Sequence, residues 1–270
     1  MNVLDREFSK KFDVVYKATV EAGKLIHFRP MSQHPNIYFH QYNGLTETCK
    51  ENENRVIVYL NENLDDKEME HVTAHELCHI IINEKGFLFQ YRINKTKLYN
   101  VLLKNLGKKQ AQLMFDGMHN KMITRFAFIK SSFTDIIADI YMKKYNYAMN
   151  TETQSKINRI KKDIIELDLK DKEKTFLNAI VYVSLIFRKK YSCSIIEPSD
   201  IEKVYRKYNR QPILRIARNI LSKLPSGSLL EPKEFYDILK KMRNLYIQTI
   251  GIPLKKTIIE LRNPWTSETE

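Results

Sequence analysis

The feature that most constrains the fold of this chain is the position of its prolines. The chain has 270 residues and eight prolines, at positions 30, 35, 198, 212, 225, 232, 253 and 264. No proline occurs between Ile37 and Glu197, and because proline interrupts helices, this interval can hold long uninterrupted ones. Apolar residues recur there at helical spacing. The sequence therefore predicts a predominantly helical protein with one large domain or two modest ones.

Strand-forming segments are confined to a region near the N-terminus. A helix is predicted first, over residues 5–22. Two runs rich in β-forming residues follow, Ile37–Gln41 and Arg55–Leu60, with a polar loop between them. A second helix is predicted from Asp65 to about Asn83, with a glycine just past its end. The fold class expected is α+β and predominantly helical, with a small sheet before this helix.

The rest of the chain predicts helices. Residues 87–130 indicate helices joined by turns at Gly107 and Gly117, and a further helix is expected from Ser132 to about Tyr145. After Asn150 the chain is rich in Lys, Ile and Leu at helical spacing, with breaks at the later prolines. This change of composition predicts a domain boundary near residue 150.

Charge is unevenly distributed along the chain, for which the predicted domains are 1–150 and 151–270. Residues 1–142 contain 19 basic and 17 acidic residues, whereas residues 143–270 contain 26 basic and 15 acidic ones. All seven histidines lie before residue 120. The titratable groups suited to chemistry are thus in the first domain, and the second is a basic helical region without an evident role.

The cysteines and the N-terminus bear on the cellular compartment. Cys49, Cys78 and Cys193 are odd in number, far apart and form no CxxC pair, so neither a disulfide framework nor a cysteine-rich zinc site is indicated. The first seven residues lack the apolar core of a signal peptide, and no stretch approaches the ~20 apolar residues of a membrane span. We expect a protein of the reducing cytoplasm.

An HExxH motif, formed by His75, Glu76 and His79, is the segment that carries chemistry. Positions four apart on a helix share one face, so the two imidazoles can bind one metal ion. Zinc accepts histidine nitrogen, and catalytic zinc sites keep three protein ligands and one open position. Glu76 projects about 100° around the helix from His75, where it can act as the general base on water whose pKa zinc lowers to roughly 7.

The motif also has a simpler interpretation, as a solvated helix face with two histidines. In a chain of this composition the pattern is expected by chance only about 0.01 times. Ala74, Cys78 and Ile81 give the helix an apolar back that can be buried, so we expect Cys78 to be a structural thiol. His71 also lies four residues before His75, but a valine stands where the base would be.

The run His75-Glu76-Leu77-Cys78-His79 resembles the signature of the zincin metallopeptidases. The metzincin branch is excluded, because Ile82 and Lys85 stand where its glycine and third histidine would be. The gluzincin branch takes its third ligand from a second helix, and Asp135-Ile-Ile-Ala-Asp139 resembles that pattern with Asp in place of Glu. The resemblance implies Asp135 as the third ligand and Asp139 as an acceptor that orients a ligand histidine. The shorter side chain requires a closer approach of the second helix.

The residues alone leave the third ligand open. Other candidates by ligand chemistry are Asp139, Asp116, His119 and Glu84, and a site without a third protein ligand is a further alternative. Asp135 also has a structural interpretation, because with Ser132 it could form a capping box at the start of a helix.

Similarity to the cytoplasmic ImmA/IrrE-type proteins is carried by Thr73–Ile81, with Cys78 in place of the usual glycine. It covers at most residues 50–145. This similarity implies a protein substrate, often a transcriptional repressor in that family.

The zincin resemblance also implies where a substrate would lie. In zincins the substrate backbone pairs with the edge strand that precedes the motif helix, which implies Arg55–Leu60 here unless that run is an interior strand. Tyr141 and His119 are candidates for the group that stabilises the oxyanion.

The sequence thus predicts a zinc-dependent metallopeptidase, with zinc as cofactor and a protein or peptide as substrate. The alternative is a basic protein with a zincin-like fold that binds nucleic acid or an acidic partner with little or no turnover. Lysine clusters in the second domain support this alternative, although such clusters are usually the solvated side of amphipathic helices.

Overall fold

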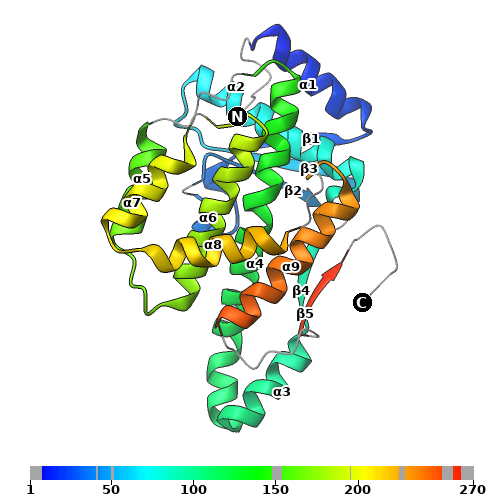
Figure 1. Ribbon diagram of the computed structural model, residues 1–270. Coiled ribbons are helices and arrows are strands. Elements are labelled where there is room, and N and C mark those ends of the chain that lie inside the picture. The colour runs from blue at the N-terminus through cyan, green and yellow to red at the C-terminus, as the bar shows by residue number, and fades with distance from the viewer. Residues whose placement is uncertain are drawn as a thin grey trace. The chain divides into compact units, whose positions relative to one another are not determined.

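The computed structural model describes residues 8–40, 42–49, 52–147, 154–194, 196–224, 229–250 and 258–262. Within these ranges the chain is α+β and predominantly helical, with one three-stranded and one two-stranded sheet, as predicted (Figure 1). It forms two compact units. The first unit contains residues 1–86 and 137–149, and the second contains residues 87–136 and 150–270.

This division differs from the predicted domains 1–150 and 151–270. The break near residue 150 coincides with one unit boundary, but residues 87–136 group with the C-terminal region. The other boundary falls inside helix α4 (Lys108–Lys144), which runs from the second unit into the first. Because a continuous helix carries no glycine- or proline-rich linker, its sequence gives no sign of the boundary.

The first unit packs helices against a mixed sheet. Its main elements are α1 (Lys10–Glu21), β1 (Leu25–Pro30), β2 (Gly44–Cys49), β3 (Asn52–Leu60), α2 (Asp66–Ile82) and the last turns of α4. The strand order is β1-β3-β2, with β1 parallel and β2 antiparallel to β3. Helix α2 packs against β2 and β3, and α1 packs on α2.

One prediction about the sheet is wrong, and one alternative that the sequence left open is decided. Ile37–Phe39 forms a 3₁₀ turn instead of a strand, and Gln41 lies outside the described residues. Arg55–Leu60 is a strand, within β3, but β3 pairs on both sides and is therefore interior, not an edge strand. The sequence did not predict β1 and β2, because strand formation depends on packing partners more than on intrinsic propensity.

Helix α2 is the element that the sequence predicts best. The side chain of Asp65 caps its start by accepting a hydrogen bond from the Glu68 N–H at 2.8 Å. It ends at Ile82, and Gly86 beyond it has the left-handed φ of 92°. Nine of its residues are buried, among them Leu77 and Cys78. Burial of this apolar face fixes which side of the helix carries the histidines.

The second unit is built around α6. Its elements are β4 (Gln90–Ile93), α3 (Lys95–Leu106), most of α4, α5 (Gln154–Ile165), α6 (Lys172–Lys190), α7 (Pro198–Lys207), α8 (Gln211–Lys223), α9 (Pro232–Ile250) and β5 (Ile259–Arg262). Helices α7, α8 and α9 pack against α6 (Figure 1). Strands β4 and β5 form an antiparallel ribbon. In the described part of the chain, no helix is long and apolar enough to cross a membrane.

Helix α4 is longer than predicted. Gly107, with φ of 77°, ends α3, but Gly117 makes no turn and lies within α4. Ser132 is also inside this helix, where its hydroxyl donates to the Phe128 carbonyl at 2.8 Å. A capping box of Ser132 with Asp135 is therefore excluded, because no helix starts there.

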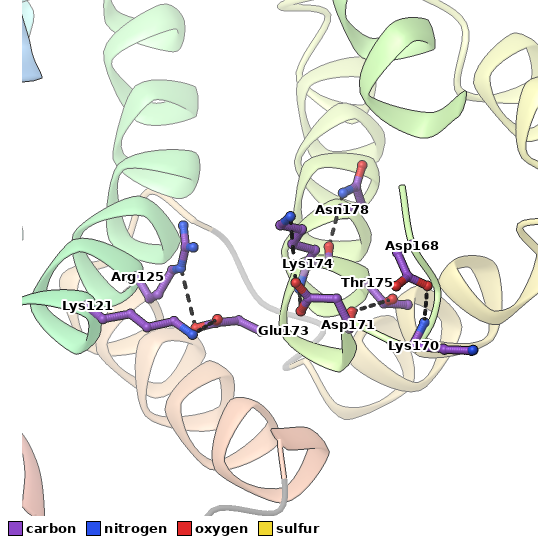
Figure 2. A network of polar contacts seen from close by, with 9 residues as sticks. All are labelled: Lys121, Arg125, Asp168, Lys170, Asp171, Glu173, Lys174, Thr175 and Asn178. Atoms are coloured by element: carbon purple, nitrogen blue, oxygen red, sulfur yellow. Dashed lines mark hydrogen bonds and ion pairs between the residues drawn. The ribbon is translucent and has the colours of Figure 1, made fainter. Parts of the chain in front are cut away.

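A buried carboxylate joins three helices of the second unit. Glu173, in the first turn of α6, lies 2.6 Å from Lys121 Nζ and 3.3 Å from Arg125 Nε, both on α4 (Figure 2). The Tyr246 hydroxyl of α9 donates to the same carboxylate at 2.6 Å. Desolvation would raise the pKa of Glu173, but these hydrogen bonds and charges outweigh it and lower the pKa.

Candidate metal centre

The two histidines of the motif lie side by side on α2. His75 and His79 are half-buried, and their Nε2 atoms are 3.2 Å apart. Two nitrogen ligands bound at 2.0–2.1 Å to a tetrahedral zinc ion are separated by about 3.3 Å. The spacing of the Nε2 atoms therefore fits two ligands of one metal ion.

Asp139 lies on the other side of the His75 ring. Its Oδ1 atom is 3.2 Å from His75 Nδ1, and its side chain is only 6% exposed. A carboxylate in this position accepts a hydrogen bond from the Nδ1–H of His75 and leaves the lone pair of Nε2 available. This is the geometry that the resemblance implied for Asp139.

Asp135 brings a carboxylate to the two imidazoles. Ligand atoms of His75, His79 and Asp135 all lie within 4.8 Å of one another, and the three residues are half-buried. Asp135 is one turn before Asp139 on the continuous helix α4, so both carboxylates share one face of it. Two imidazoles and a carboxylate form a donor set that suits zinc. These three residues could therefore hold a metal ion.

Glu76 is buried beside the edge strand β2. The hydroxyl of Thr46 donates to Glu76 Oε2 at 2.8 Å and also lies 3.2 Å from the backbone oxygen of Glu76. Glu76 is 8% exposed. Since Oε2 is engaged by Thr46, Oε1 is the carboxylate oxygen left to accept a proton.

Gly44 allows the close approach of β2 to α2. A Cβ atom at position 44 would lie 2.7 Å from Val72 Cγ1 and 2.8 Å from Glu76 Oε1. Side chains do not tolerate such distances, so any larger residue must displace Glu76 or the strand. Neither Gly44 nor Thr46 was predicted from the sequence to lie at the site. Asn43-Gly44 indicated only a loop, and no sequence signal links β2 to the motif helix.

A hydrogen-bond cluster ties α1, α2 and the end of α4 together. Glu70 of α2 accepts from the Ser9 hydroxyl at 2.5 Å, the Ser9 N–H at 2.9 Å and the Tyr147 hydroxyl at 3.0 Å. Burial would raise the pKa of Glu70, but the Ser9 and Tyr147 hydrogen bonds lower it. Because Tyr147 follows α4 directly, the cluster helps to hold Asp139 near His75.

The other candidate ligands lie away from the group. Asp116 and His119 precede Asp135 on α4 by about 29 and 24 Å along the helix axis, at 1.5 Å per residue. Glu84 forms an ion pair with Lys24, with 2.9 Å between Oε1 and Nζ. Because His119 is about 24 Å from Asp135 along the helix axis, it also cannot stabilise an oxyanion at the candidate metal centre.

Tyr141 is the remaining candidate for stabilising an oxyanion. It is two residues past Asp139, which turns it about 200° around α4 and away from the carboxylate face. The ammonium groups of Lys85 and Lys144 lie 5.8 and 4.4 Å from the centre of its ring. The proposed oxyanion role of Tyr141 is therefore not supported by this geometry.

Burial changes the pKa of two further residues of α2, Cys78 and His71. Cys78 is fully buried, as predicted, and burial raises the pKa of its thiol well above the usual range. Burial, together with the nearby His75, lowers the pKa of His71. His71 is not part of the candidate metal-binding group.

No family model matches the chain, and searches of curated proteins and of solved structures gave no match. The likeness to the zincins rests on the motif and on the pair of aspartates.

Proposed function

We propose that this protein is a zinc-dependent metallopeptidase that hydrolyses peptide bonds of a protein substrate. The observation that carries the proposal is the convergence of His75, His79 and Asp135, with the Nε2 atoms of the two histidines 3.2 Å apart. A bound zinc ion would supply Lewis-acid polarisation of the substrate carbonyl and of water.

Residues of the chain would carry out the proton transfer and would position the base and a metal ligand. Glu76 takes the proton from the attacking water at Oε1 and passes it to the leaving amide nitrogen. Thr46 holds the other carboxylate oxygen and so fixes the direction of the base. Asp139 keeps the proton of His75 on Nδ1, which orients the ring and raises its basicity.

The free edge of β2 is suited to an extended substrate. In the described part of the chain β2 pairs only with β3. The Asn61 N–H donates to the Asn43 carbonyl, and since hydrogen-bonded pairs alternate in antiparallel strands, the backbone groups of Thr46 and Thr48 face the open side. An added strand there would pass beside Glu76, which supports a peptide substrate bound by β-augmentation.

Metal analysis and cleavage assays test the proposal. The purified protein should contain stoichiometric zinc, and His79→Ala should lose it. His71→Ala is the matched control, one helical turn before His75, and should retain zinc. Glu76→Gln should retain zinc and lose cleavage of a fluorescence-quenched peptide library. Absence of zinc with no change on His79→Ala, or full activity of Glu76→Gln, would contradict the proposal.

A second candidate function is supported by the charge of the two units. The first unit contains 12 basic and 15 acidic residues, whereas the second contains 33 basic and 17 acidic residues. Such a basic unit favours binding of nucleic acid or of an acidic partner. Binding of a DNA or RNA oligonucleotide should then weaken steeply with salt and persist in Glu76→Gln. No binding at low salt would remove this candidate.

A further inference from the structure

A cleft in the second unit lies outside the candidate metal centre. Its volume is about 550 Å³, within the range of about 300–1,000 Å³ typical of small-molecule sites. The charged and titratable side chains that line the cleft are Arg92, Lys95, His119, Glu260 and Arg262. Ile123 contributes an apolar surface. They come from β4, α3, α4 and β5, so the cleft is formed by tertiary structure.

The cleft has an excess of positive charge. Glu260 is the one carboxylate among its lining residues. Its Oε2 atom lies 3.0 Å from Arg262 Nη2, and Oε1 is within 3.9 Å of Lys97. Among the described residues, Arg92 and Lys95 have no such partner. Two cations of the cleft are therefore left without a compensating carboxylate.

The β-ribbon presents these groups on one face. Arg92 is directly opposite Glu260 in the β4–β5 register, while Ile93 pairs with Ile259. Since side chains alternate along a strand, Ile93 and Ile259 point to the buried face and Arg92, Glu260 and Arg262 to the other. The pairing with Glu260 also orients the guanidinium of Arg262.

One donor of Arg262 is unsatisfied. Its Nε atom is buried and has no hydrogen-bond partner among the described residues. A buried N–H without an acceptor is unfavourable by about 1–3 kcal/mol. Because this atom is closed to solvent, a bound anion would contact the rest of the guanidinium of Arg262, which lines the cleft. Guanidinium groups suit phosphate oxygens in particular, because their planar fork donates in parallel.

The start of α3 adds to the positive potential. Its first turn contains Lys95 and Lys97 and no acidic residue, although the helix dipole favours negative charge at this end. A bound anion would reduce the unfavourable positive potential at this end of α3.

We propose that this cleft binds a small organic phosphate monoester. Such a group carries a charge of about −1.5 to −2 at pH 7, which matches the two uncompensated cations, Arg92 and Lys95. The phosphate lies against these residues and the guanidinium of Arg262. The organic part lies on Ile123, whose side chain is 45% exposed.

Calorimetric titration of the full chain tests this proposal, with AMP and glucose 6-phosphate as probes and adenosine and inorganic phosphate as comparisons. At least one monoester should bind, more tightly than inorganic phosphate, and adenosine should not. Arg92→Gln and Arg262→Gln should each weaken binding by about tenfold or more. Arg92 is exposed, so its variant should stay folded, which circular dichroism checks.

Arg215→Gln is the matched control, because it removes the same charge from an exposed position on α8 of the same unit. It should change the affinity less than about twofold. Equal weakening by Arg92→Gln and Arg215→Gln would show that only the overall charge of the unit matters, and would overturn the proposal. Binding of neither monoester at millimolar concentration would also overturn it. Glu76→Gln should bind as the wild type does, which separates this site from the proposed peptidase.

Discussion

Two small residues of β2 control the environment of Glu76. Thr46 donates a hydrogen bond to its carboxylate, and Gly44 provides the space that the side chain occupies. A proposed base held in this way keeps one direction with respect to His75 and His79. Its placement depends on a strand that is distant in sequence from the motif.

Gly44→Ala should displace Glu76. The new methyl group would meet Val72 and Glu76 below 3 Å, so we expect a loss of stability of about 1–3 kcal/mol. We expect a loss of cleavage of about tenfold or more, with zinc retained. Gly117→Ala is the control, because a Cβ there meets nothing within 4 Å, and it should stabilise α4 by about 0.5–1 kcal/mol. Thermal denaturation and metal analysis of both variants check this. Unchanged cleavage in Gly44→Ala would contradict it.

The two aspartates of α4 should differ in their effect on zinc affinity. Asp135→Ala removes a proposed ligand and should cause the larger loss. Asp139→Ala removes only the acceptor of His75 Nδ1 and should weaken zinc binding by about 10–100-fold. Competition with a chromogenic chelator measures both affinities. The assignment fails if Asp139→Ala has the larger effect, and both roles fail if neither variant loses affinity.

At the scale of elements, α2 and β2 differ in how far the sequence predicts them. Helix α2 carries its own signals, namely the cap at Asp65, an apolar face, and Gly86 past its end. Strand β2 has the sequence Gly-Leu-Thr-Glu-Thr-Cys, with few strong β-formers. It becomes a strand because β3 offers it a partner and α2 covers one of its faces.

Proline substitutions in β2 should separate substrate binding from folding. The N–H of Thr48 faces the open edge, so Thr48→Pro should keep the sheet and weaken cleavage of an extended peptide by about tenfold. The N–H of Leu45 faces β3, so Leu45→Pro should destabilise the first unit by several-fold more than Thr48→Pro. Denaturant titration and the peptide-library assay measure the two effects. Equal stability of the two variants would contradict the inferred register of backbone groups.

At the scale of the whole molecule, the structural units divide the charge more sharply than the linear sequence does. Residues 87–136 contain nine basic and two acidic residues and belong to the second unit, which leaves the first with a slight excess of acid. His75, Glu76 and His79 therefore belong to a unit with a slight excess of acid, whereas the residues of the proposed phosphate site belong to the strongly basic unit.

Acid should weaken the second unit through Glu173. Its pKa is lowered in the folded protein, so its contribution to stability is present above the unfolded value of about 4.5 and is lost as the pH falls through the lowered value. Glu173→Gln should reduce the free energy of unfolding at pH 7 by about 1–3 kcal/mol, with a smaller difference from the wild type near pH 3. Urea denaturation at both pH values measures this. A difference that does not shrink with acid would contradict the assignment.

The sequence by itself determined the helical character of the chain, the extent of α2, and the two histidines and glutamate that α2 carries. These features are local, because caps, apolar periodicity and four-residue spacing act within one helix. Only the tertiary structure decided that β3 is interior, that β2 is the edge strand beside Glu76, and that Asp135 lies with the histidines while Asp116 and His119 do not. Those outcomes depend on which distant segments pack together, and the free energy of that packing is not encoded in any single segment.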